Sequence, residues 1–351
     1  MCKSGVAHGI RMLLVVADGK GDSEEAGVVI RDVGSPTGRI DRMWSAADRV
    51  GRAAAPLNAD LYHLHDPELM PVGLRLKRLG KRVIFDAHED LPKQMLGKHY
   101  LSKPLRRILS SVLSRYETYV CNRFDGVIAA TPFIRKKFLP MNPNTVDICN
   151  YPILTELGGA ISWPDKKREV CYVGGLSRSR GITDIVNAMS MCQADVRLNL
   201  CGRFEPPTYE QELKGLNGWA RVSARGHVGR NKVREVMSRS MAGLVTLHPL
   251  VNYVDALPVK MFEYMSAGIP VIASNFLLWR EIIDGNNCGL LVNPLKPEQI
   301  AAAINELVCD PEQARRMGEN GRAAVEQRYN WSIEERKLLD FYKHILTTRQ
   351  N

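Results

Sequence analysis

Two carboxylates and a lysine surround the predicted start of one short helix in the segment DALPVKMFEYMSAGIPVIAS, residues 255–274. A proline suits the first turn of this helix and a Gly-x-Pro suits its end, which predicts a helix over residues 258–267. The N-terminus of a helix attracts anions, and Lys260 adds a positive charge there. Glu263 lies one turn later and Asp255 just before, so the segment predicts a phosphate pocket flanked by two acceptors for sugar hydroxyls. The competing interpretation is a surface pair of Lys260 with Glu263.

A second segment, CYVGGLSRSRGITDIVNAM (residues 171–189), combines a predicted strand, a Gly174–Gly175 turn, two arginines and a helix that opens near Gly181. A glycine turn lets the backbone approach a phosphate, and the guanidinium groups of Arg178 and Arg180 could bind its oxygens in a bidentate manner. The competing interpretation is a plain strand-to-helix turn with solvated arginines.

In the amino-terminal half, YHLHDPELMP (62–71) and VIFDAHEDLP (83–92) each follow a predicted strand with histidines and carboxylates. Both groups should therefore lie at the carboxyl edge of a sheet, where open α/β folds bind ligands. The candidate residues on this edge are His65, Asp66, His88, Glu89 and Asp90. Helix capping is an alternative role for Asp66 and Asp90.

A metal site is the rival interpretation of the HLH sequence, because histidine and aspartate are good zinc ligands. The H-x-H of amidohydrolases belongs to a closed eight-stranded barrel, which the glycine turn and residues 255–274 do not fit. The chain also has no D-x-D motif of the kind that metal-dependent GT-A transferases use. We therefore expect no bound metal.

Short apolar runs alternate with longer helical patterns along the whole chain, which predicts an α/β protein with parallel sheets. The predicted strands lie within residues 12–18, 27–33, 60–65, 81–88, 126–131, 145–151, 169–175, 196–202, 242–248 and 269–274. A stretch rich in Gly and Pro, residues 150–168, is the predicted boundary between two domains. We expect domains at 1–155 and 156–330 and a final helix in 331–351. Ser332 and Glu335 could form its capping box, and the helix could pack on its own domain or return across the cleft.

Composition limits the class of protein. No apolar run approaches the ~20 residues that span a bilayer, no signal peptide is evident, and the eight cysteines are scattered without C-x-x-C. These features predict a cytosolic protein without disulfides or structural zinc. The net charge is +10, and residues 98–137 hold nine basic and two acidic side chains, which indicates an anionic partner or a solvated basic face. Within that stretch, residues 103–124 predict an amphipathic helix, either buried on one side or lying on a membrane.

The segment 255–274 resembles the signature of glycosyltransferase family 4, whose members are retaining enzymes with the GT-B fold. That resemblance implies two Rossmann-like open parallel-sheet domains facing a central cleft. It also implies that Glu263 holds the nucleotide ribose and that Asp255, in a position usually taken by Glu, contacts the donor sugar. Arg180 matches a lysine that grips the pyrophosphate, whereas Gly175 stands where the family has an arginine; Lys260 is the candidate that restores this charge. His88 matches a histidine beside the donor sugar and the acceptor.

The resemblance implies a metal-independent transferase in which His88, Asp255, Arg180 and Lys260 serve catalysis. A UDP- or GDP-linked sugar would be the donor, and a glycan or lipid-linked molecule would be the acceptor, in surface polysaccharide or lipopolysaccharide assembly. We expect no cofactor and no nucleic-acid partner, with a peripheral contact to anionic lipid at the inner face of the cytoplasmic membrane. The family's first strand and loop have no counterpart in the sequence. A GT-B nucleotide-sugar epimerase and a catalytically weakened nucleotide-sugar-binding protein are the alternatives.

Overall fold

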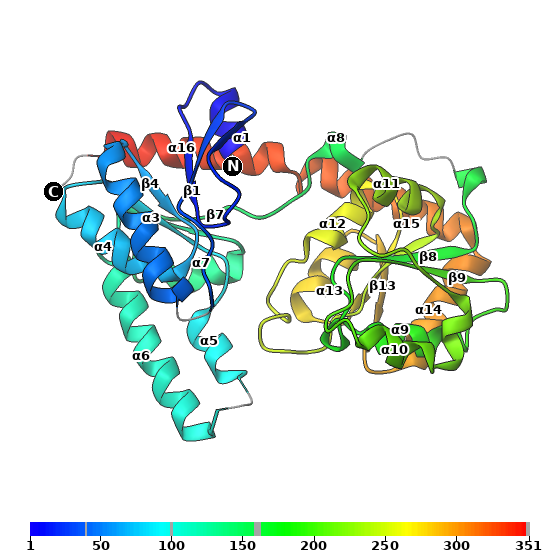
Figure 1. Ribbon diagram of the computed structural model, residues 1–351. Coiled ribbons are helices and arrows are strands. Elements are labelled where there is room, and N and C mark those ends of the chain that lie inside the picture. Colours follow the sequence, from blue (N-terminus) through cyan, green and yellow to red (C-terminus); the bar gives the residue numbers. More distant parts are fainter. Residues whose placement is uncertain (39–40, 99–100, 158–162, 349–351) are drawn as a thin grey trace. The chain divides into compact units, whose positions relative to one another are not determined.

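A computed structural model describes residues 1–38, 41–98, 101–157 and 163–348, and the chain divides into two compact units. The first unit comprises residues 1–149 and 332–351, and the second comprises residues 150–331 (Figure 1). The sequence placed the division after residue 155, within a stretch whose residues 158–162 lie outside the described residues. Each unit is described below by itself.

The first unit contains two separate sheets. A three-stranded sheet has the order β1-β3-β2, and a four-stranded parallel sheet has the order β4-β5-β6-β7. Its strands are β1 (Leu13–Val16), β2 (Ser23–Glu25), β3 (Val28–Asp32), β4 (Tyr62–Leu64), β5 (Val83–Ala87), β6 (Gly126–Ala129) and β7 (Thr145–Asp147). Strands β2 and β3 run antiparallel, so the expectation of parallel pairing alone is wrong here. The continuous apolar run that predicted β5 is buried along its whole length, as expected of a central parallel strand.

Helices cover the four-stranded sheet of this unit. They are α1 (Cys2–Ala7), α3 (Ala47–Ala54), α4 (Met70–Arg78), α5 (Leu91–Leu96), α6 (Lys103–Cys121), α7 (Pro132–Phe138) and α16 (Trp331–Thr347). Helix α16 packs on the sheet, because a side chain on Gly126 of β6 would meet Phe341 at 2.6 Å and Ile345 at 3.0 Å. The helix begins at Trp331, so the predicted cap at Ser332 is wrong and that serine lies inside the first turn.

Helix α6 has the predicted amphipathic pattern, but much of its apolar stripe is exposed. Ile108 is 61% exposed and Val112 is 54% exposed, and Leu105 is exposed as well. Only the carboxyl-terminal end of the helix, near Val120 and Cys121, is buried. The interpretation of the whole stripe as a buried face is therefore wrong. No helix in the described part of the chain is both long enough and apolar enough to span a bilayer.

The second unit is one six-stranded parallel sheet with the order β10-β9-β8-β11-β12-β13. Its strands are β8 (Glu169–Val173), β9 (Arg197–Cys201), β10 (Val222–Ala224), β11 (Ala242–Val245), β12 (Val271–Ser274) and β13 (Gly289–Val292). Its helices are α8 (Leu154–Leu157), α9 (Ile182–Met189), α10 (Tyr209–Lys214), α11 (Arg230–Arg239), α12 (Val259–Ser266), α13 (Leu277–Ile283), α14 (Pro297–Cys309) and α15 (Pro311–Gln327). All ten predicted strands are present, whereas β2, β10 and β13 were not predicted.

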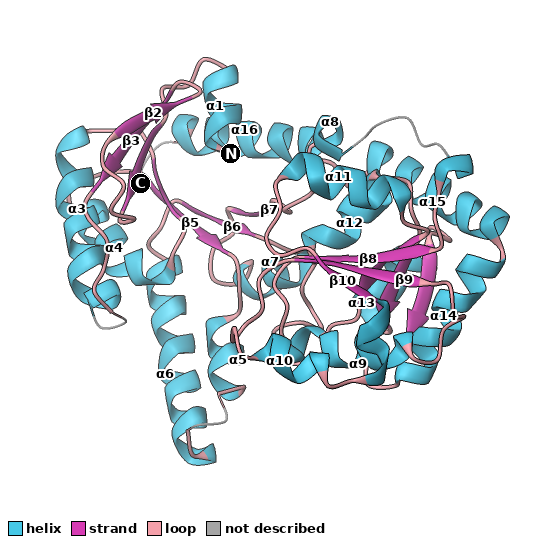
Figure 2. Cartoon of the chain, turned by 45° about the vertical axis from the view of Figure 1, so that its right-hand side comes forward, coloured by secondary structure: helices cyan, strands magenta, loops and turns pink. Residues whose placement is uncertain are grey.

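Alternation along the strands divides the apolar core of this unit into two layers, one on each face of the sheet. Val170 and Tyr172 of β8 pack with α9 and α14, whereas Cys171 packs with α11, α12 and α13. Figure 2 shows these helices on both sides of the strands. Residues inside both layers are buried on all sides, which makes the strand ends the places where polar groups can meet a ligand.

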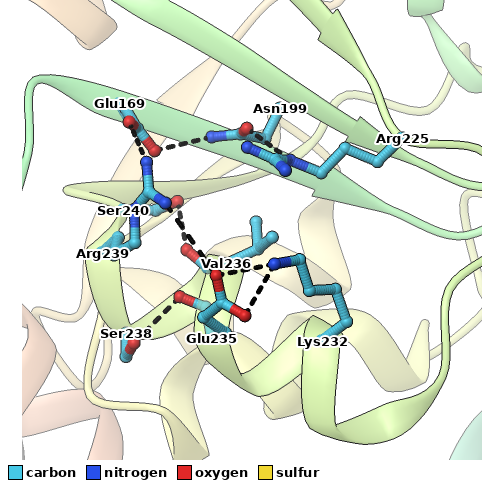
Figure 3. A network of polar contacts seen from close by, with 9 residues as sticks. All are labelled: Glu169, Asn199, Arg225, Lys232, Glu235, Val236, Ser238, Arg239 and Ser240. Atoms are coloured by element: carbon cyan, nitrogen blue, oxygen red, sulfur yellow. Dashed lines mark hydrogen bonds and ion pairs between the residues drawn. The ribbon is translucent and has the colours of Figure 1, made fainter.

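A polar network joins α11 to the sheet at the amino-terminal ends of the strands (Figure 3). Glu169 of β8 accepts from Arg239 at 2.5 Å and from Asn199 of β9 at 2.9 Å. Arg225, just after β10, donates to the oxygen of Asn199 at 2.8 Å. These contacts fix the three strands to one another, and they lie at the opposite end of β8 from the glycine turn.

Candidate functional site

The glycine turn after β8 is shaped by one position that requires glycine. Gly174 has a φ of 125°, which side chains rarely adopt, and its N–H donates to the carbonyl of Cys201. A Cβ atom built on Gly174 would lie 2.9 Å from Nζ of Lys260 and 3.9 Å from Nη1 of Arg180. The turn therefore leaves room for two cationic side chains that arrive from other elements.

Lys260 and Arg180 thus meet at the glycine turn, as the sequence predicted for a phosphate pocket. Lys260 is buried in the first turn of α12, and its Nζ lies 3.7 Å from the centroid of the Tyr172 ring. Among the described residues this Nζ has no hydrogen-bond partner. Burial, with Arg180 as a second cause, lowers the pKa of Lys260 well below its ordinary value. A buried cation without a partner is costly, so the arrangement is suited to an anion that supplies the missing contacts.

The topology of the sheet explains why these two residues meet. The chain passes from β8 outward to β9 and β10 and then returns to β11, on the other side of β8. The strand order reverses at this place, and open α/β sheets bind ligands at such a switch point beyond the carboxyl ends of the strands. Gly174 follows β8 directly, and α12 follows the loop after β11. Helix α12 spans Val259–Ser266, within one residue of its predicted bounds, and Gly268 has the predicted left-handed φ of 66°.

Glu263 does not pair with Lys260, so the interpretation as a surface pair is wrong. Its buried carboxylate instead accepts from Nη1 of Arg230 at 2.6 Å, and Nη2 of Arg230 lies 2.7 Å from Glu156. The contact with Arg230 involves one oxygen, Oε1, of the Glu263 carboxylate. Arg230 thus orients Glu263 from α11, and the second oxygen can accept from a ligand hydroxyl.

Asp255 and Arg178 differ in their relation to this cationic pair. Asp255 is half-buried in the turn that precedes α12. Arg178 is 63% exposed and forms an ion pair with Glu212 of α10, whereas Arg180 lies at the glycine turn. The structure therefore brings Arg180 and Lys260 together with Gly174 and Gly175 and places the Arg178 side chain on the surface.

Two further contacts hold the short turn that carries Arg180. The N–H of His248, after β11, donates to the carbonyl of Ser179 at 2.9 Å. The ring Nε2 of His248 lies 2.7 Å from Oδ2 of Asp184 in α9. Gly181 has a φ of 75°, and a side chain there would strike the carbonyl of Thr246 at 2.1 Å. Glycine is thus required where the turn passes into α9, as the sequence predicted.

In the first unit, the predicted histidines gather around a carboxylate that was not predicted. Oδ2 of Asp86 lies 3.1 Å from Nδ1 of His65, 3.4 Å from Nε2 of His63 and 3.5 Å from Nε2 of His88. Burial alone would raise the pKa of Asp86, but the close imidazole nitrogens, first those of His63 and His65, hold the pKa of this carboxyl far below its ordinary value. Burial lowers the pKa of His63. His65 and His88 are 40% and 41% exposed, so they are the members of the cluster that solvent reaches.

The three acidic candidates beside these histidines take different places. Asp90 caps α5 by accepting from the N–H of Lys93 at 3.1 Å, and it also contacts Lys137 at 2.9 Å. Asp66 precedes a short helical turn without a side-chain cap and lies 3.7 Å from Arg42. Glu89 is exposed beside His88. The capping alternative is therefore correct for Asp90, and the side-chain cap is wrong for Asp66.

Sequence reasoning missed four residues that shape these sites. Tyr172 lies beneath Lys260, and Arg230 orients Glu263; neither belongs to a recognisable motif. His63 and Asp86 complete the histidine cluster. A signal for these two did exist, because His63 is two residues before His65 and Asp86 is two residues before His88. Residues at this spacing share one face of a strand.

Two models of protein families match most of the chain. The model described as Glycosyltransferase Family 4 matches residues 1–147. The model described as Glycosyl transferases group 1 matches residues 156–324, which include the glycine turn and α12. The two matched regions correspond closely to the two halves that the sequence analysis separated.

Relatives with known activities are similar at lower identity. Alpha-maltose-1-phosphate synthase of Mycobacterium tuberculosis is 27% identical over 256 residues, which are 63% of each chain. MMP alpha-(1->4)-mannosyltransferase of Mycolicibacterium hassiacum is 21% identical over 307 residues, 84% of this chain and 73% of the relative. The matched region spans between 51% and 63% of the length of the alpha-maltose-1-phosphate synthases.

Solved structures share the fold over nearly the whole chain. Sucrose-phosphate synthase from Thermosynechococcus elongatus superposes with a TM-score of 0.81 and 20% identity, over 98% of this chain and 91% of the other. HepE of Anabaena in complex with UDP gives a TM-score of 0.72 and 16% identity, over 95% of this chain and 100% of the other. At these identities the likeness concerns the fold.

Proposed function

Because the chain belongs to glycosyltransferase family 4 and has the GT-B fold, we propose that it is a retaining enzyme that uses a nucleoside diphosphate sugar. It transfers the sugar to a glycan or lipid-linked acceptor in the assembly of a surface polysaccharide. The observation that carries the proposal is the unpartnered, buried ammonium of Lys260 beside Arg180 at the glycine turn.

The chemistry of this pair fits the diphosphate of the donor. Two cations near Gly174 can bind the negative charge that develops on the leaving diphosphate, which is electrostatic catalysis without a metal ion. The N-terminal end of α12 adds unpaired N–H groups and the positive end of the helix dipole. UDP is the nucleotide bound in the HepE structure, and a UDP- or GDP-linked sugar fits the same groups.

Two carboxylates serve the rest of the donor in this proposal. Glu263, oriented by Arg230, holds the ribose hydroxyls through its second oxygen. Asp255, in the turn before α12, contacts the transferred sugar. On the acceptor side, the exposed imidazole of His88 approaches the reacting hydroxyl, with His65 and Glu89 beside it. Asp66 remains an acceptor-side candidate, whereas Asp90 is already engaged as a cap.

The exposed stripe of α6 supports contact with a membrane that carries a lipid-linked acceptor. Ile108 and Val112 project apolar groups, and the basic side chains of Lys103, Arg107 and Arg115 are also exposed. An amphipathic helix of this composition binds anionic lipid by burying its apolar side chains and by attraction of its basic groups. We place the enzyme at the cytoplasmic face of the membrane for this reason.

The test is an incubation of the purified protein with labelled UDP- and GDP-sugars, with and without membrane extract. Transfer that depends on the extract is the expected result, and Lys260→Met should reduce it. A rearranged sugar nucleotide formed without extract would identify an epimerase, and donor binding without any product would identify a binding protein. The absence of binding to every donor nucleotide would overturn the assignment of the pocket itself.

A further inference from the structure

The histidine cluster of the first unit is built by two adjacent parallel strands. Strand β4 carries His63, followed two residues later by His65, and β5 carries Asp86, followed two residues later by His88. His63 pairs with Ile84, and Leu64 pairs with Phe85. Because paired residues of parallel strands share a face and alternate residues return to it, the three histidines and Asp86 project from the same face of the sheet.

Three atoms of this cluster are buried without a hydrogen-bond partner among the described residues. They are Nε2 of His63 and both carboxylate oxygens of Asp86. Asp86 is 1% exposed, and the nitrogen–oxygen distances of 3.1–3.5 Å bring charge together without the directions of a hydrogen bond. Buried polar atoms are nearly always satisfied, so such a group indicates an absent ligand or ion.

The other nitrogen of His63 is held from outside the cluster. Nδ1 lies 2.8 Å from the hydroxyl of Tyr342 in α16, which fixes the orientation of the ring. A partner of this kind on the far nitrogen is typical of histidines that bind a metal through the near one. The unpartnered Nε2 then faces Asp86.

We propose that His63 Nε2, His65 Nδ1 and one carboxylate oxygen of Asp86 form a binding site for a divalent transition-metal ion, with zinc as the best match. These three ligand atoms all lie within 4.8 Å of one another. Zinc–nitrogen bonds of about 2.0–2.1 Å in a tetrahedral site place neighbouring ligand atoms about 3.4 Å apart. The distances of 3.4 Å from His63 and 3.1 Å from His65 to Asp86 are close to this separation.

The ligand set also selects the class of ion. Two imidazoles and one carboxylate suit zinc, copper or nickel, whereas magnesium and calcium prefer oxygen ligands. The rings of His63 and His65 are stacked with centroids 4.2 Å apart, so binding requires a tilt of His65, whose exposed side has room for it. The fourth position faces His88, whose Nε2 lies 3.5 Å from the same oxygen, and is taken by this nitrogen or by water.

A second cluster in the same unit shows why the satisfaction of hydrogen bonds decides the choice. Asp147, Cys149 and Glu334 also bring three ligand atoms within 4.8 Å. There, however, Glu334 accepts from the N–H of Cys149 at 2.8 Å and from Lys337 at 2.8 Å. Its carboxylate is already satisfied, so no ion is needed. The histidine cluster has no such contacts, and the proposal replaces the expectation of a metal-free protein at that place.

The experiment is a zinc titration of the full-length protein after dialysis against a chelator, followed by calorimetry. We expect one saturable site, and cobalt in its place should give the visible absorption of a four-coordinate ion. His65→Asn and Asp86→Asn should weaken binding by more than about 100-fold, and Tyr342→Phe by about 10-fold, as for loss of a second-shell partner. His227→Asn, an exposed histidine of the second unit, is the matched control and should bind as the parent does.

Circular dichroism of each variant checks that the fold is retained, and His65→Asn is the safer variant because its side chain is partly exposed. Zinc should also raise the thermal midpoint of the parent and of His227→Asn but not that of His65→Asn. Equal affinity in the parent and in both ligand variants would overturn the proposal, as would the lack of saturable binding in the parent. These readouts use no sugar nucleotide, so they are independent of the proposed transferase activity.

Discussion

Replacement of Lys260 by methionine should stabilise the free protein and weaken its binding of a nucleoside diphosphate. Methionine keeps most of the volume of the buried stem and removes an ammonium that has no hydrogen-bond partner among the described residues. A buried polar group without a partner costs about 1–3 kcal/mol, so the unfolding free energy should rise by about that amount. A charge-assisted hydrogen bond contributes about 1.5–3 kcal/mol, which corresponds to a loss of about 10- to 100-fold in affinity for UDP or GDP.

The pH dependence of stability follows from the lowered pKa of Lys260. Between that lowered pKa and the ordinary value of 10.5, the unfolded chain binds a proton that the folded chain does not. The unfolding free energy of the parent should therefore rise with pH in this window relative to Lys260→Met. A bound diphosphate favours the charged lysine, so binding takes up a proton where the free lysine is neutral, and the affinity of the parent falls as pH rises.

Calorimetric titrations with UDP and GDP in two buffers of different protonation enthalpy measure both the affinity and the proton uptake, and urea unfolding gives the stability. Lys166→Met is a matched control, because Lys166 is a second lysine of the same unit whose pKa burial lowers, to about 8, and its Nζ donates to the carbonyl of Met237. That variant should keep the affinity of the parent. The reasoning would be refuted if Lys260→Met destabilised the protein and bound UDP with unchanged affinity and unchanged proton uptake.

Three further predictions use other parts of the molecule. Gly174→Ala should weaken UDP binding by at least about 10-fold, because its Cβ would lie 2.9 Å from Lys260 Nζ at a φ of 125°, whereas Gly226→Ala, with a φ of 65° and open space around it, should cost stability alone; titration and unfolding separate the two. Glu263→Gln should reduce the affinity for UDP by about 10-fold and leave that for inorganic pyrophosphate unchanged, and an equal loss for both would contradict a ribose contact. The double change Ile108→Ser with Val112→Ser should reduce sedimentation with anionic vesicles by about 10-fold or more, and unchanged binding would exclude the stripe of α6 as the lipid contact.

Local chemistry made much of the second unit predictable. The apolar runs that predicted β8, β9, β11 and β12 are strands buried on both faces, and such runs carry their own signal. Gly181 and Gly268 marked the ends of elements, because only glycine readily adopts the positive φ found at both positions. The bounds of α12 were accurate for the same reason. Short strands with polar residues, such as β2 and β10, lack this signal and were missed.

Contacts between distant parts of the sequence could not be predicted in the same way. The partner of Glu263 is Arg230 on another helix, and the nearby residue Lys260 was the plausible but incorrect choice. Asp86 looked like a polar interruption in an apolar strand, although it is the centre of the histidine cluster. For α6, periodicity identifies an apolar stripe but not whether another element covers it, so the exposure of Ile108 was not predictable.

The meeting of Arg180 and Lys260 also explains why glycine is suitable at position 175. A Cβ on Gly175 would lie 3.6 Å from Cζ of Arg180, so an arginine there would bring a second guanidinium against the first. Lys260 approaches instead from α12, on the neighbouring side of β8, and reaches the turn next to Gly174 without that crowding. Because β8 and β11 are adjacent, a cation carried after either strand arrives at the same point. The sheet therefore fixes where positive charge gathers, whereas the sequence can vary which loop supplies it.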